Sequence, residues 1–363
     1  MESLVMSPFW QGKSVLVTGH TGFKGSWLSL WLTELGATVH GLAMPPDTSP
    51  TLFEQLHLST AVDHVVGDVR NASLVASRVH DVQPDVVFHL AAQPLVMRSY
   101  AQPALTWETN VMGTVHVLEA LRSLDKAVAV VIATTDKVYE NLESRHAYRE
   151  TDRLGGRDPY SASKSATELA VASWRSSFFC ESFGTRVATA RAGNVIGGGD
   201  WAEDRIIPDL IRALAADRPV RVRNADAVRP WQHVLEPLSA YLLLAERLHG
   251  SNSFELQDAF NFGPSLDGCR TVGDLVVECL RWWPGKWEAA SLAGAPHEAE
   301  LLTLSTEKAN SLLGWQPRWS FSEGVAHTIS WYRRGDSTAH AVCLRQIEEY
   351  SAGIGGGATP EQS

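Results

Sequence analysis

The sequence predicts an α/β fold built on a doubly wound parallel sheet. In the first half of the chain, short apolar segments alternate with segments whose apolar residues recur at helical spacing. Residues 128–132 are apolar at every position, as expected for a strand that is buried on both faces of a parallel sheet. Regular alternation of this kind requires right-handed crossovers, with helices on both sides of the sheet. Ligands of such sheets bind beyond the carboxyl ends of the strands, so function is sought there.

Each expected element is justified by its own pattern. The first helix is expected over residues 25–35, because Trp27, Leu28, Trp31 and Leu32 recur at helical spacing and Gly36 can end the helix. The strands are expected where short apolar runs precede helical segments, at residues 14–17, 38–43, 64–67, 85–90, 128–133 and 186–190. Glycine-rich turns and Trp-Pro pairs interrupt the second half, where we expect a smaller, mixed α/β domain.

Composition and charge argue against several classes of function. A formal net charge of -10 disfavours nucleic acid and anionic membrane surfaces as partners. No stretch approaches the roughly 18 apolar residues of a membrane span. The first eleven residues carry neither lysine nor arginine, so a secretory signal is not expected and we predict a cytoplasmic protein. The cysteines form no CxxC pair, so we expect neither a disulfide framework nor a metal site; they are Cys180, Cys269, Cys279 and Cys343.

The loop after the first expected strand carries the strongest cofactor signal. It reads TGHTGFKG, with Gly19, Gly22 and Gly25 between the strand and the helix. Glycine permits a tight turn, and the free N–H groups and dipole of a helix N-terminus attract phosphate. The loop therefore predicts a Rossmann-type dinucleotide site. Residues 41–44, at the end of the second strand, offer neither an acid for a ribose 2′-hydroxyl nor an arginine for a 2′-phosphate. This segment leaves NAD and NADP open.

Two further segments are candidates for catalysis. Tyr160 and Lys164 form YSASK, and positions four apart share one face of a helix. An ammonium beside a phenol is expected to lower the pKa of the phenol, which would make the tyrosine usable as a base. TTDKVYEN follows the expected strand 128–133 and carries the charged pair Asp136 and Lys137. Charge alone fits a solvated turn equally well, but a position at the carboxyl end of a strand favours chemistry.

Two segments in the middle of the chain are candidates for substrate binding. RAGNVIGGGDWAEDRIIPD contains three successive glycines, Gly197–Gly199, which allow backbone donors to approach a ligand. RPWQHVLEPL contains Arg229, whose planar guanidinium suits phosphate oxygens. His233 in the same segment is balanced between a role facing the ligand and a buried structural role.

The segments GHTGFKGSWL, TTDKVYEN, YSASK, RAGNVIGGGDW and RPWQHVLEPL resemble the extended short-chain dehydrogenase/reductase family. Within that family they are similar to the nucleotide-sugar 4,6-dehydratases. Many of these carry glutamate where Lys137 stands, and lysine there is most similar to the CDP-glucose 4,6-dehydratases. The resemblance covers roughly the first two-thirds of the chain.

The resemblance implies NAD as the cofactor. It makes Tyr160 the acid/base, Lys164 the residue that holds the nicotinamide ribose, and Asn110 a support for the proton path. It also implies a set of cofactor-binding residues in the glycine loop and after the third and fourth expected strands: Gly19, Gly22, Phe23, Gly25, Asp68, Val69, Leu90, Ala91 and Ala92.

The resemblance further implies a 4,6-dehydration, most similar to that of CDP-glucose to CDP-4-keto-6-deoxyglucose. Such a reaction oxidises carbon 4, eliminates water across carbons 5 and 6 and returns the hydride to carbon 6, so it needs proton-transfer groups beside the tyrosine. Thr135 would hydrogen-bond the reacting oxygen and Asp136 would protonate the leaving 6-hydroxyl. Lys137 would act at carbon 5, either as the base or as an electrostatic stabiliser of the enolate.

The remaining expectations concern substrate, assembly and domains. The resemblance implies nucleotide-sugar binding by Asn194, Arg205, Arg229 and His233, and a homodimer or homotetramer. Residues 1–190, rejoined by about 225–262, would form the NAD-binding domain; residues 191–224 and 263–350 would bind the nucleotide sugar, and 351–363 would be a disordered tail. Two alternatives stay open: another dehydratase or a 4-epimerase on the same fold, and a non-catalytic NAD-binding regulator.

Overall fold

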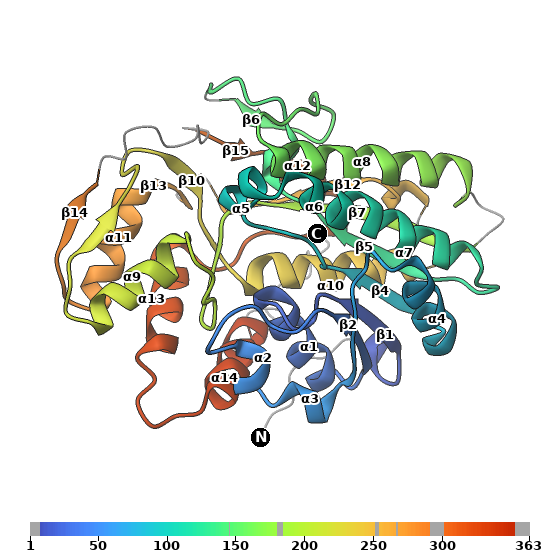
Figure 1. Cartoon of the computed structure of the whole chain (residues 1–363), viewed down its shortest axis with the longest axis horizontal. Coiled ribbons are helices and arrows are strands. Elements are labelled where there is room, and N and C mark those ends of the chain that lie inside the picture. Colours follow the sequence, from blue (N-terminus) through green and yellow to red (C-terminus); the bar gives the residue numbers. More distant parts are fainter. Residues whose placement is uncertain are drawn as a thin grey trace, which may run out of the picture.

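The computed structural model describes residues 8–144, 146–179, 184–250, 254–265, 268–290 and 301–352. In this part of the chain, a seven-stranded sheet forms the centre of the molecule (Figure 1). Every neighbouring pair of its strands is parallel. From edge to edge the strands are β12 (Ala259–Phe262), β7 (Arg186–Ala192), β5 (Ala129–Ala133), β4 (Val86–His89), β1 (Ser14–Thr18), β2 (Thr38–Ala43) and β3 (Asp63–Val66). The chain therefore runs outward from β1 in both directions, which confirms the predicted doubly wound sheet.

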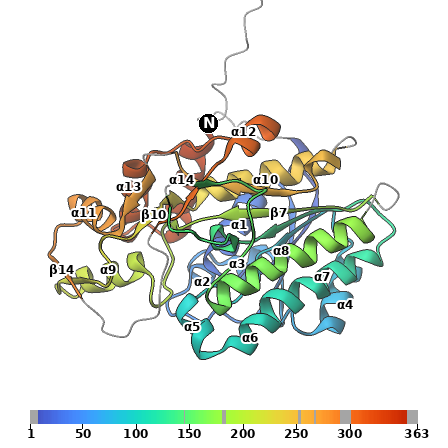
Figure 2. The same ribbon diagram turned by 90° about the horizontal axis from the view of Figure 1, so that it is seen from above.

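Helices cover both faces of this sheet, as Figure 2 shows. One face carries α4 (Ala72–Val82), α7 (Gly113–Arg122) and α8 (Pro159–Ser177), and the other carries α1 (Phe23–Glu34) and α10 (Leu235–His249). Alternate strand residues serve the two layers. Leu16 and Val130 belong to the core under α4 and α7, whereas Val15, Val17 and Val131 belong to the core under α1 and α10. This two-sided burial explains why the strands read as continuous apolar runs.

Two element boundaries differ by two residues from the sequence-based expectation, for local reasons. Helix α1 begins at Phe23, two residues earlier than expected, because Gly22 is the extended N-cap and Gly25 lies inside the first turn. Strand β7 continues to Ala192, two residues beyond the expected end, because Ala190 and Ala192 pair with β12.

A smaller mixed α/β region lies to one side of the sheet, at the left of Figure 1. Its core is a separate apolar cluster that includes Ile211, Leu275 and Ile329. The helices of this region are α9 (Ile206–Ala215), α11 (Val272–Trp282) and α13 (Phe321–Tyr332). Its short strand pairs are β9 (Val220–Val222) with β14 (Trp287–Ala289), β10 (Val228–Pro230) with β13 (Cys269–Thr271), and β8 (Val195–Ile196) with β11 (Gln232–His233).

Gly198 lies at the junction between the two regions. The indole Nε1 of Trp27, on α1, donates a hydrogen bond of 2.9 Å to the carbonyl oxygen of Gly198. From the other side Trp331, on α13, packs so closely that a Cβ at residue 198 would lie 1.9 Å from its Cγ. The junction therefore accepts only glycine.

The remaining elements connect and close the fold. The expectation that the tail begins at residue 351 is wrong, because α14 continues to Ala352 and Ser351 is buried. Residues 353–363 and Cys180 lie outside the described residues. In the described ranges, the other elements are α2 (Leu52–Gln55), α3 (Leu58–Ala61), α5 (Val96–Ala101), α6 (Pro103–Trp107), α12 (Glu307–Leu313), α14 (Ala339–Ala352), β6 (Ala147–Tyr148), β15 (Thr303–Leu304) and the 3-10 turns Pro8–Trp10, Asp136–Val138 and Phe254–Leu256.

Within the described ranges, no helix is long and apolar enough to cross a membrane. The same ranges contain no group of three or more histidine, cysteine or acidic side chains that could hold a metal ion. Cys279 and Cys343 are free thiols.

The junction predicts a stability difference between two glycine substitutions. Gly198→Ala should lower the free energy of unfolding by about 1–3 kcal/mol, because the added methyl group overpacks a buried indole. Gly324→Ala is the matched control on α13: its Cβ would lie 3.5 Å from the Cβ of His233, an ordinary contact, and should stabilise the helix by about 0.5–1 kcal/mol. Urea unfolding of both variants measures the difference. Equal stability of the two would contradict the tight contact.

Candidate active site

The glycine loop forms a cradle made of backbone. Gly19 follows β1 with φ +76, and a Cβ at this residue would lie 2.7 Å from the backbone nitrogen of Ala91. A Cβ at Gly25 would lie 2.2 Å from the carbonyl oxygen of Gly19. Gly22 caps α1 without a side-chain hydrogen bond, so the first N–H groups of the helix are available to an external acceptor. This arrangement fits the phosphates of a dinucleotide.

The other residues expected to bind the cofactor line the ends of neighbouring strands. Leu90, Ala91 and Ala92 directly follow β4, and the backbone nitrogen of Leu90 donates to the Thr18 carbonyl at 3.1 Å. Phe23 lies at the start of α1, where a Cβ at Gly197 would come within 3.0 Å of its ring. The loops after β1 and β4 therefore lie together at the carboxyl edge of the sheet.

Asp68 and Val69 follow β3. Asp68 accepts hydrogen bonds from the Arg70 side chain, at 2.6 Å from Nη2, and this contact lowers the pKa of its carboxyl. Val69 is buried and its carbonyl oxygen lies 2.9 Å from Nδ1 of His116. The segment that follows the edge strand β3 is therefore held by these two contacts, and its Asp68 carboxylate is ionised.

His20 is a loop residue whose role the sequence did not reveal. Its buried ring lies over β2, where a Cβ at Gly41 would come within 2.5 Å of it. Its Nε2 lies 2.7 Å from Nδ1 of His64 on β3. Burial lowers the pKa of His20 to about 4, so the ring is neutral at neutral pH. The glycine at the centre of β2 is therefore explained by the ring that covers it.

Asn110 ties the cofactor side of the site to helix α8. It lies in a π-helical turn, Glu108–Met112, a local structure that is frequent at functional sites. Its Oδ1 accepts from the Gln93 backbone nitrogen at 2.8 Å, and its Nδ2 donates to the Ser163 hydroxyl at 2.9 Å. Because α8 also carries Tyr160 and Lys164, Asn110 sets their distance from the loop after β4.

Thr135, Asp136 and Tyr160 form one contact set. Thr135 follows β5 and begins the turn Asp136–Val138; its Oγ1 donates to Oδ1 of Asp136 at 2.9 Å. The Thr135 side chain also lies close enough to Tyr160 to act to lower the pKa of that phenol. Three of the predicted catalytic residues thus lie together, although a long loop and the start of α8 separate Tyr160 from Thr135 in the sequence.

Burial dominates the electrostatics of this set. Asp136 is only 2% exposed, and loss of solvent raises the pKa of its carboxyl even though Lys137, Arg229 and Lys24 act to lower it. A raised pKa keeps a carboxylic acid protonated at higher pH, as a general acid requires. Lys137, next in sequence, is only half-buried.

The expected lowering of the tyrosine pKa is wrong for this structure. Burial raises the pKa of Tyr160 to about 12, and Arg205 is among the groups that oppose this rise. Lys164 instead responds to burial itself: its Nζ donates to the Ala133 carbonyl oxygen at 3.0 Å, and its own pKa falls to about 8. For Tyr160, the rise in pKa caused by desolvation therefore outweighs the lowering caused by the positive charge of Arg205.

Lys24 is the second residue at this site that the sequence did not single out. It lies in the first turn of α1, directly after the glycine loop, and it interacts electrostatically with Asp136, Lys164 and Arg205. Burial lowers its pKa to about 8. The available signal was a lysine inside TGFKG, a loop otherwise made of small and apolar residues.

Two of the four residues predicted to bind the substrate, Arg229 and Arg205, lie near Asp136 and Tyr160. Arg229 is buried close enough to Asp136 to lower the pKa of that carboxyl. Arg205 forms an ion pair of 2.9 Å with Asp200 and interacts electrostatically with Tyr160. These two guanidinium groups make the substrate side of the site positive in an acidic protein.

The other two substrate residues lie in different surroundings. Asn194 is half-buried after β7, and its backbone oxygen accepts from Gln232 at 3.1 Å. His233 is 1% exposed, and its ring packs 4.8 Å from the ring of Trp319 and 6.1 Å from that of Trp27. These neighbours favour the structural one of the two roles considered for His233.

Comparison with known proteins places this geometry in a family. A family model described as GDP-mannose 4,6 dehydratase matches residues 16–259. The chain is 46% identical to a CDP-glucose 4,6-dehydratase of Salmonella typhimurium, over 94% of this chain and 97% of the relative. It is 28% identical to a dTDP-glucose 4,6-dehydratase of Xanthomonas campestris pv. campestris, over 87% of this chain and 92% of the relative.

A solved structure agrees with these sequence relationships. The dTDP-glucose 4,6-dehydratase of Streptomyces venezuelae, determined with NAD bound, superposes with a TM-score of 0.75 at 25% identity. The superposition covers 88% of this chain and 97% of that chain. Because the family model spans more than half of the sequence and the Salmonella relative matches nearly all of it, the chain belongs to the GDP-mannose 4,6-dehydratase family.

Proposed function

We propose that the chain catalyses the NAD-dependent 4,6-dehydration of a nucleotide-linked hexose, with CDP-glucose as the substrate and CDP-4-keto-6-deoxyglucose as the product. One observation carries the proposal: Asp136, a buried carboxyl with a raised pKa, is hydrogen-bonded to Thr135, whose side chain in turn acts on the pKa of Tyr160. Hydride transfer alone needs one acid/base group, whereas elimination of water needs further proton transfers. The 46% identical relative is named for this substrate.

In the proposed reaction, each residue acts at a stated position. NAD, held at the glycine loop, would supply the acceptor for the hydride of carbon 4 and the donor of that hydride to carbon 6. Tyr160, in its ionised form, would remove the proton of the 4-hydroxyl while Thr135 hydrogen-bonds the same oxygen. Asp136, protonated, delivers its proton to the departing 6-hydroxyl. Lys137 takes the proton of carbon 5 and gives it back when the hydride returns to carbon 6, or it stabilises the enolate while another base moves that proton.

The surrounding residues bind and orient the two ligands. The backbone cradle at Gly19 and Gly25 would hold the cofactor phosphates, and Lys164 would hold the nicotinamide ribose. Arg205 and Arg229 would hold the diphosphate of the sugar nucleotide, because planar guanidinium groups suit phosphate oxygens. Arg229 interacts with Asp136, and Arg205 interacts with Tyr160. A diphosphate bound by these two guanidinium groups would therefore place the sugar over the proton-transfer groups.

A panel of sugar nucleotides tests the proposed function. The wild-type protein, incubated with NAD and CDP-, dTDP-, GDP- or UDP-glucose, or GDP-mannose, should convert CDP-glucose with the highest kcat/KM. The product should be a 4-keto-6-deoxy sugar and no net NADH should form, as NMR and absorbance at the nicotinamide band would show. A 4-epimer as product, or net NADH, would contradict dehydration. The Tyr160→Phe variant is the control: it should bind NAD with unchanged affinity and lose turnover by at least about a hundredfold.

Substitution of Lys137 separates elimination from hydride transfer. Lys137→Ala should still transfer hydride from carbon 4 but should stall before water leaves, because the group acting at carbon 5 is gone. NADH absorbance should therefore accumulate in a single turnover, to a level not seen in the wild type. Lys137→Arg tests the open choice: an electrostatic stabiliser tolerates arginine, whereas a base does not. Wild-type turnover in Lys137→Ala would remove this residue from the mechanism.

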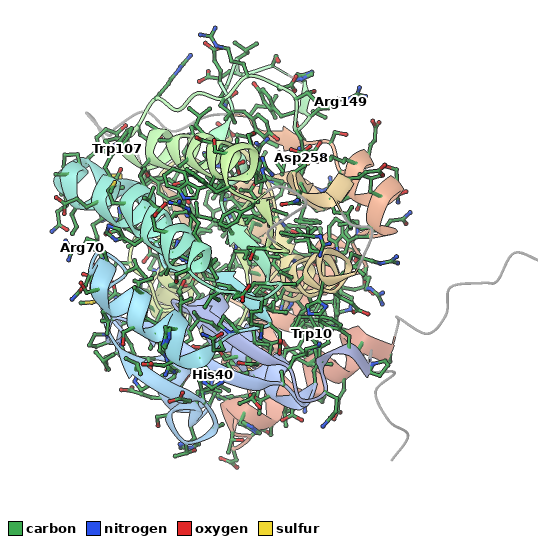
Figure 3. The ribbon with its side chains drawn as sticks, turned by 90° about the vertical axis from the view of Figure 1, so that its right-hand side faces the viewer. Trp10, His40, Arg70, Trp107, Arg149 and Asp258 are labelled. Atoms are coloured by element: carbon green, nitrogen blue, oxygen red, sulfur yellow. The ribbon has the colours of Figure 1, made fainter. Side chains whose placement is uncertain are left out.

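We also propose that the chain forms a homodimer through the helices on the α8 side of the sheet. Four large apolar side chains are exposed there, on α5, α6, the π-helical turn and α8: Tyr100, Trp107, Met112 and Leu169. Trp107 lies at the outer edge of this layer in Figure 3. Apolar surface gathered on one helical layer is typical of an interface between copies. A tetramer would need a second interface, and the cytoplasmic location expected from the sequence stays a prediction.

The oligomeric state follows from light scattering. The wild type should have twice the 39.7 kDa mass of the chain. The double variant Trp107→Arg/Leu169→Arg should be a monomer at micromolar concentration, because two charges would have to be buried. Leu312→Arg is the control on α12, where Leu312 is 43% exposed, and it should remain a dimer. A monomeric wild type would refute this interface.

A further inference from the structure

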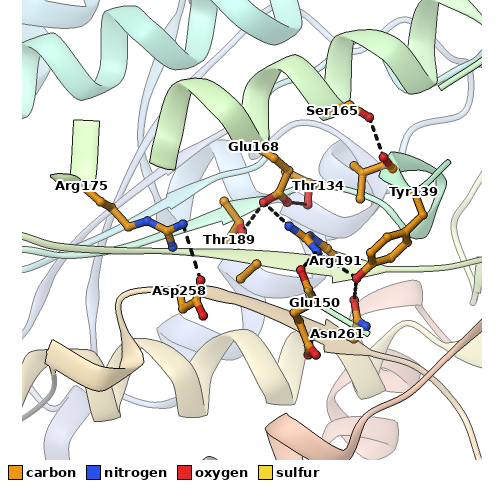
Figure 4. Close-up of polar contacts among 12 residues, drawn as sticks. Thr134, Tyr139, Glu150, Ser165, Glu168, Arg175, Thr189, Arg191, Asp258 and Asn261 are labelled. Atoms are coloured by element: carbon orange, nitrogen blue, oxygen red, sulfur yellow. Dashed lines mark hydrogen bonds and ion pairs between the residues drawn. The ribbon is translucent and has the colours of Figure 1, made fainter. Parts of the chain in front are cut away.

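The 3-10 turn Asp136–Val138, with Thr135 before it and Tyr139 after it, is called the catalytic turn. Next to it lies a buried ion pair that the proposed reaction does not use. Nη2 of Arg191, on β7, lies 2.9 Å from Oε2 of Glu168, on α8, and the two side chains are only 4% and 2% exposed (Figure 4). An ion pair removed from water costs stability unless further hydrogen bonds satisfy it. The additional partners of these two side chains therefore indicate what the pair is for.

The partners of Glu168 secure the start of the catalytic turn. The Thr134 hydroxyl donates to Oε1 of Glu168 at 2.5 Å, and the backbone nitrogen of Thr134 donates to the Ala190 carbonyl oxygen at 2.9 Å. The Thr189 hydroxyl donates to Oε2 at 2.7 Å. Because Thr134 immediately precedes Thr135, the carboxylate fixes the residue from which the turn begins.

The partners of Arg191 secure the end of the same turn. Nη1 of Arg191 donates to the Tyr139 hydroxyl at 2.9 Å, and this hydroxyl donates to Oδ1 of Asn261 at 2.6 Å. Tyr139 is 1% exposed and is the C-cap of the turn that Asp136 begins. Figure 4 shows Thr134 beside Glu168 and Tyr139 beside Arg191.

Helix α8 makes this arrangement relevant to catalysis. Glu168 lies on the helix that carries Tyr160 and Lys164, four residues beyond Lys164 and therefore on its face. The Ser165 hydroxyl adds a contact from the same helix, at 2.8 Å from the Val138 carbonyl oxygen. The turn is thus fixed relative to the helix that supplies the tyrosine.

We propose that Glu168 and Arg191 are positioning residues: their ion pair holds Thr134 and Tyr139, the two ends of the catalytic turn, at a fixed distance from Tyr160. The proposal rests on the function proposed above and adds two residues that touch neither substrate nor cofactor. Arg191 also keeps the pKa of the Glu168 carboxyl below its usual value despite burial, so Glu168 stays an ionised acceptor for both threonine hydroxyls.

Two variants test the proposal while leaving the ion pair in place. Thr134→Val removes the contact at the start of the turn, and Tyr139→Phe removes the contact at its end. Each should lower kcat at least about tenfold, because small displacements of reacting groups are costly in rate. The KM for CDP-glucose should change less than about threefold, and the affinity for NAD should not change. Thr134→Ser keeps the hydroxyl and should restore kcat to within about threefold of the wild type.

A control variant separates positioning from general destabilisation. Arg175 lies further along α8 and pairs with Asp258 at 3.7 Å, without a contact to the catalytic turn (Figure 4). Arg175→Gln should lower Tm and leave kcat within about twofold of the wild type. Glu168→Gln should lower both.

Hydrogen exchange of the peptide that covers residues 134–139 gives a readout independent of substrate. Exchange there should be at least about tenfold faster in Thr134→Val and Tyr139→Phe than in Arg175→Gln. Wild-type kcat and wild-type exchange in the first two variants would overturn the proposal, as would losses of kcat that only follow Tm. Faster exchange in a protein whose wild type forms no dehydrated product would support the positioning role and overturn the proposed function instead.

Discussion

The parallel register of the central sheet is the constraint on which the site depends. Parallel strands end at one edge, so the loops after β1, β4, β5 and β7 must meet there. The contacts are close: Gly19 after β1 touches Ala91 after β4, and a Cβ at Gly193 after β7 would lie 2.6 Å from Oδ2 of Asp136 after β5. The cofactor cradle and the proton-transfer residues are neighbours because their strands are neighbours.

Loss of solvent then decides the charge states at that edge. Desolvation is the largest cause of the pKa shifts of Asp136, Tyr160, Lys164 and Lys24, and in each case it favours the neutral form. An acid that keeps its proton and lysines that release theirs more readily are suited to proton transfer near neutral pH. The same site attracts a diphosphate through Arg205 and Arg229, whose guanidinium groups stay charged.

The sequence predicted the parts of this arrangement that are local. The strands, the glycine loop and the face shared by Tyr160 and Lys164 follow from periodicity and short spacing, and the structure contains them. The family resemblance predicted that Thr135 and Asp136 lie in the active site beside Tyr160. The raised pKa of Tyr160 was not foreseen, because a spacing of four residues gives proximity but not burial.

Contacts between distant segments could not be read from the sequence. The contact between His20 and His64 joins residues that are 44 positions apart in the sequence, and the hydrogen bond from Arg191 to Tyr139 joins residues 52 positions apart. Only the register of the folded sheet brings such pairs together. Glu168 had a weak signal, since it repeats the four-residue spacing from Tyr160 to Lys164, but an acidic residue at that position is equally typical of a solvated helix face.

The junction at Gly198 has a consequence for motion. Trp27 is hydrogen-bonded to Gly198 from one region, and Trp331 lies against the same residue from the other. A swing of the smaller region as a rigid body would have to break that bond and expose two large indoles to water, an unfavourable step for a catalytic cycle. A rigid-body opening of the smaller region is therefore more costly than a rearrangement of side chains and short loops, and we expect a sugar nucleotide to enter by such a rearrangement.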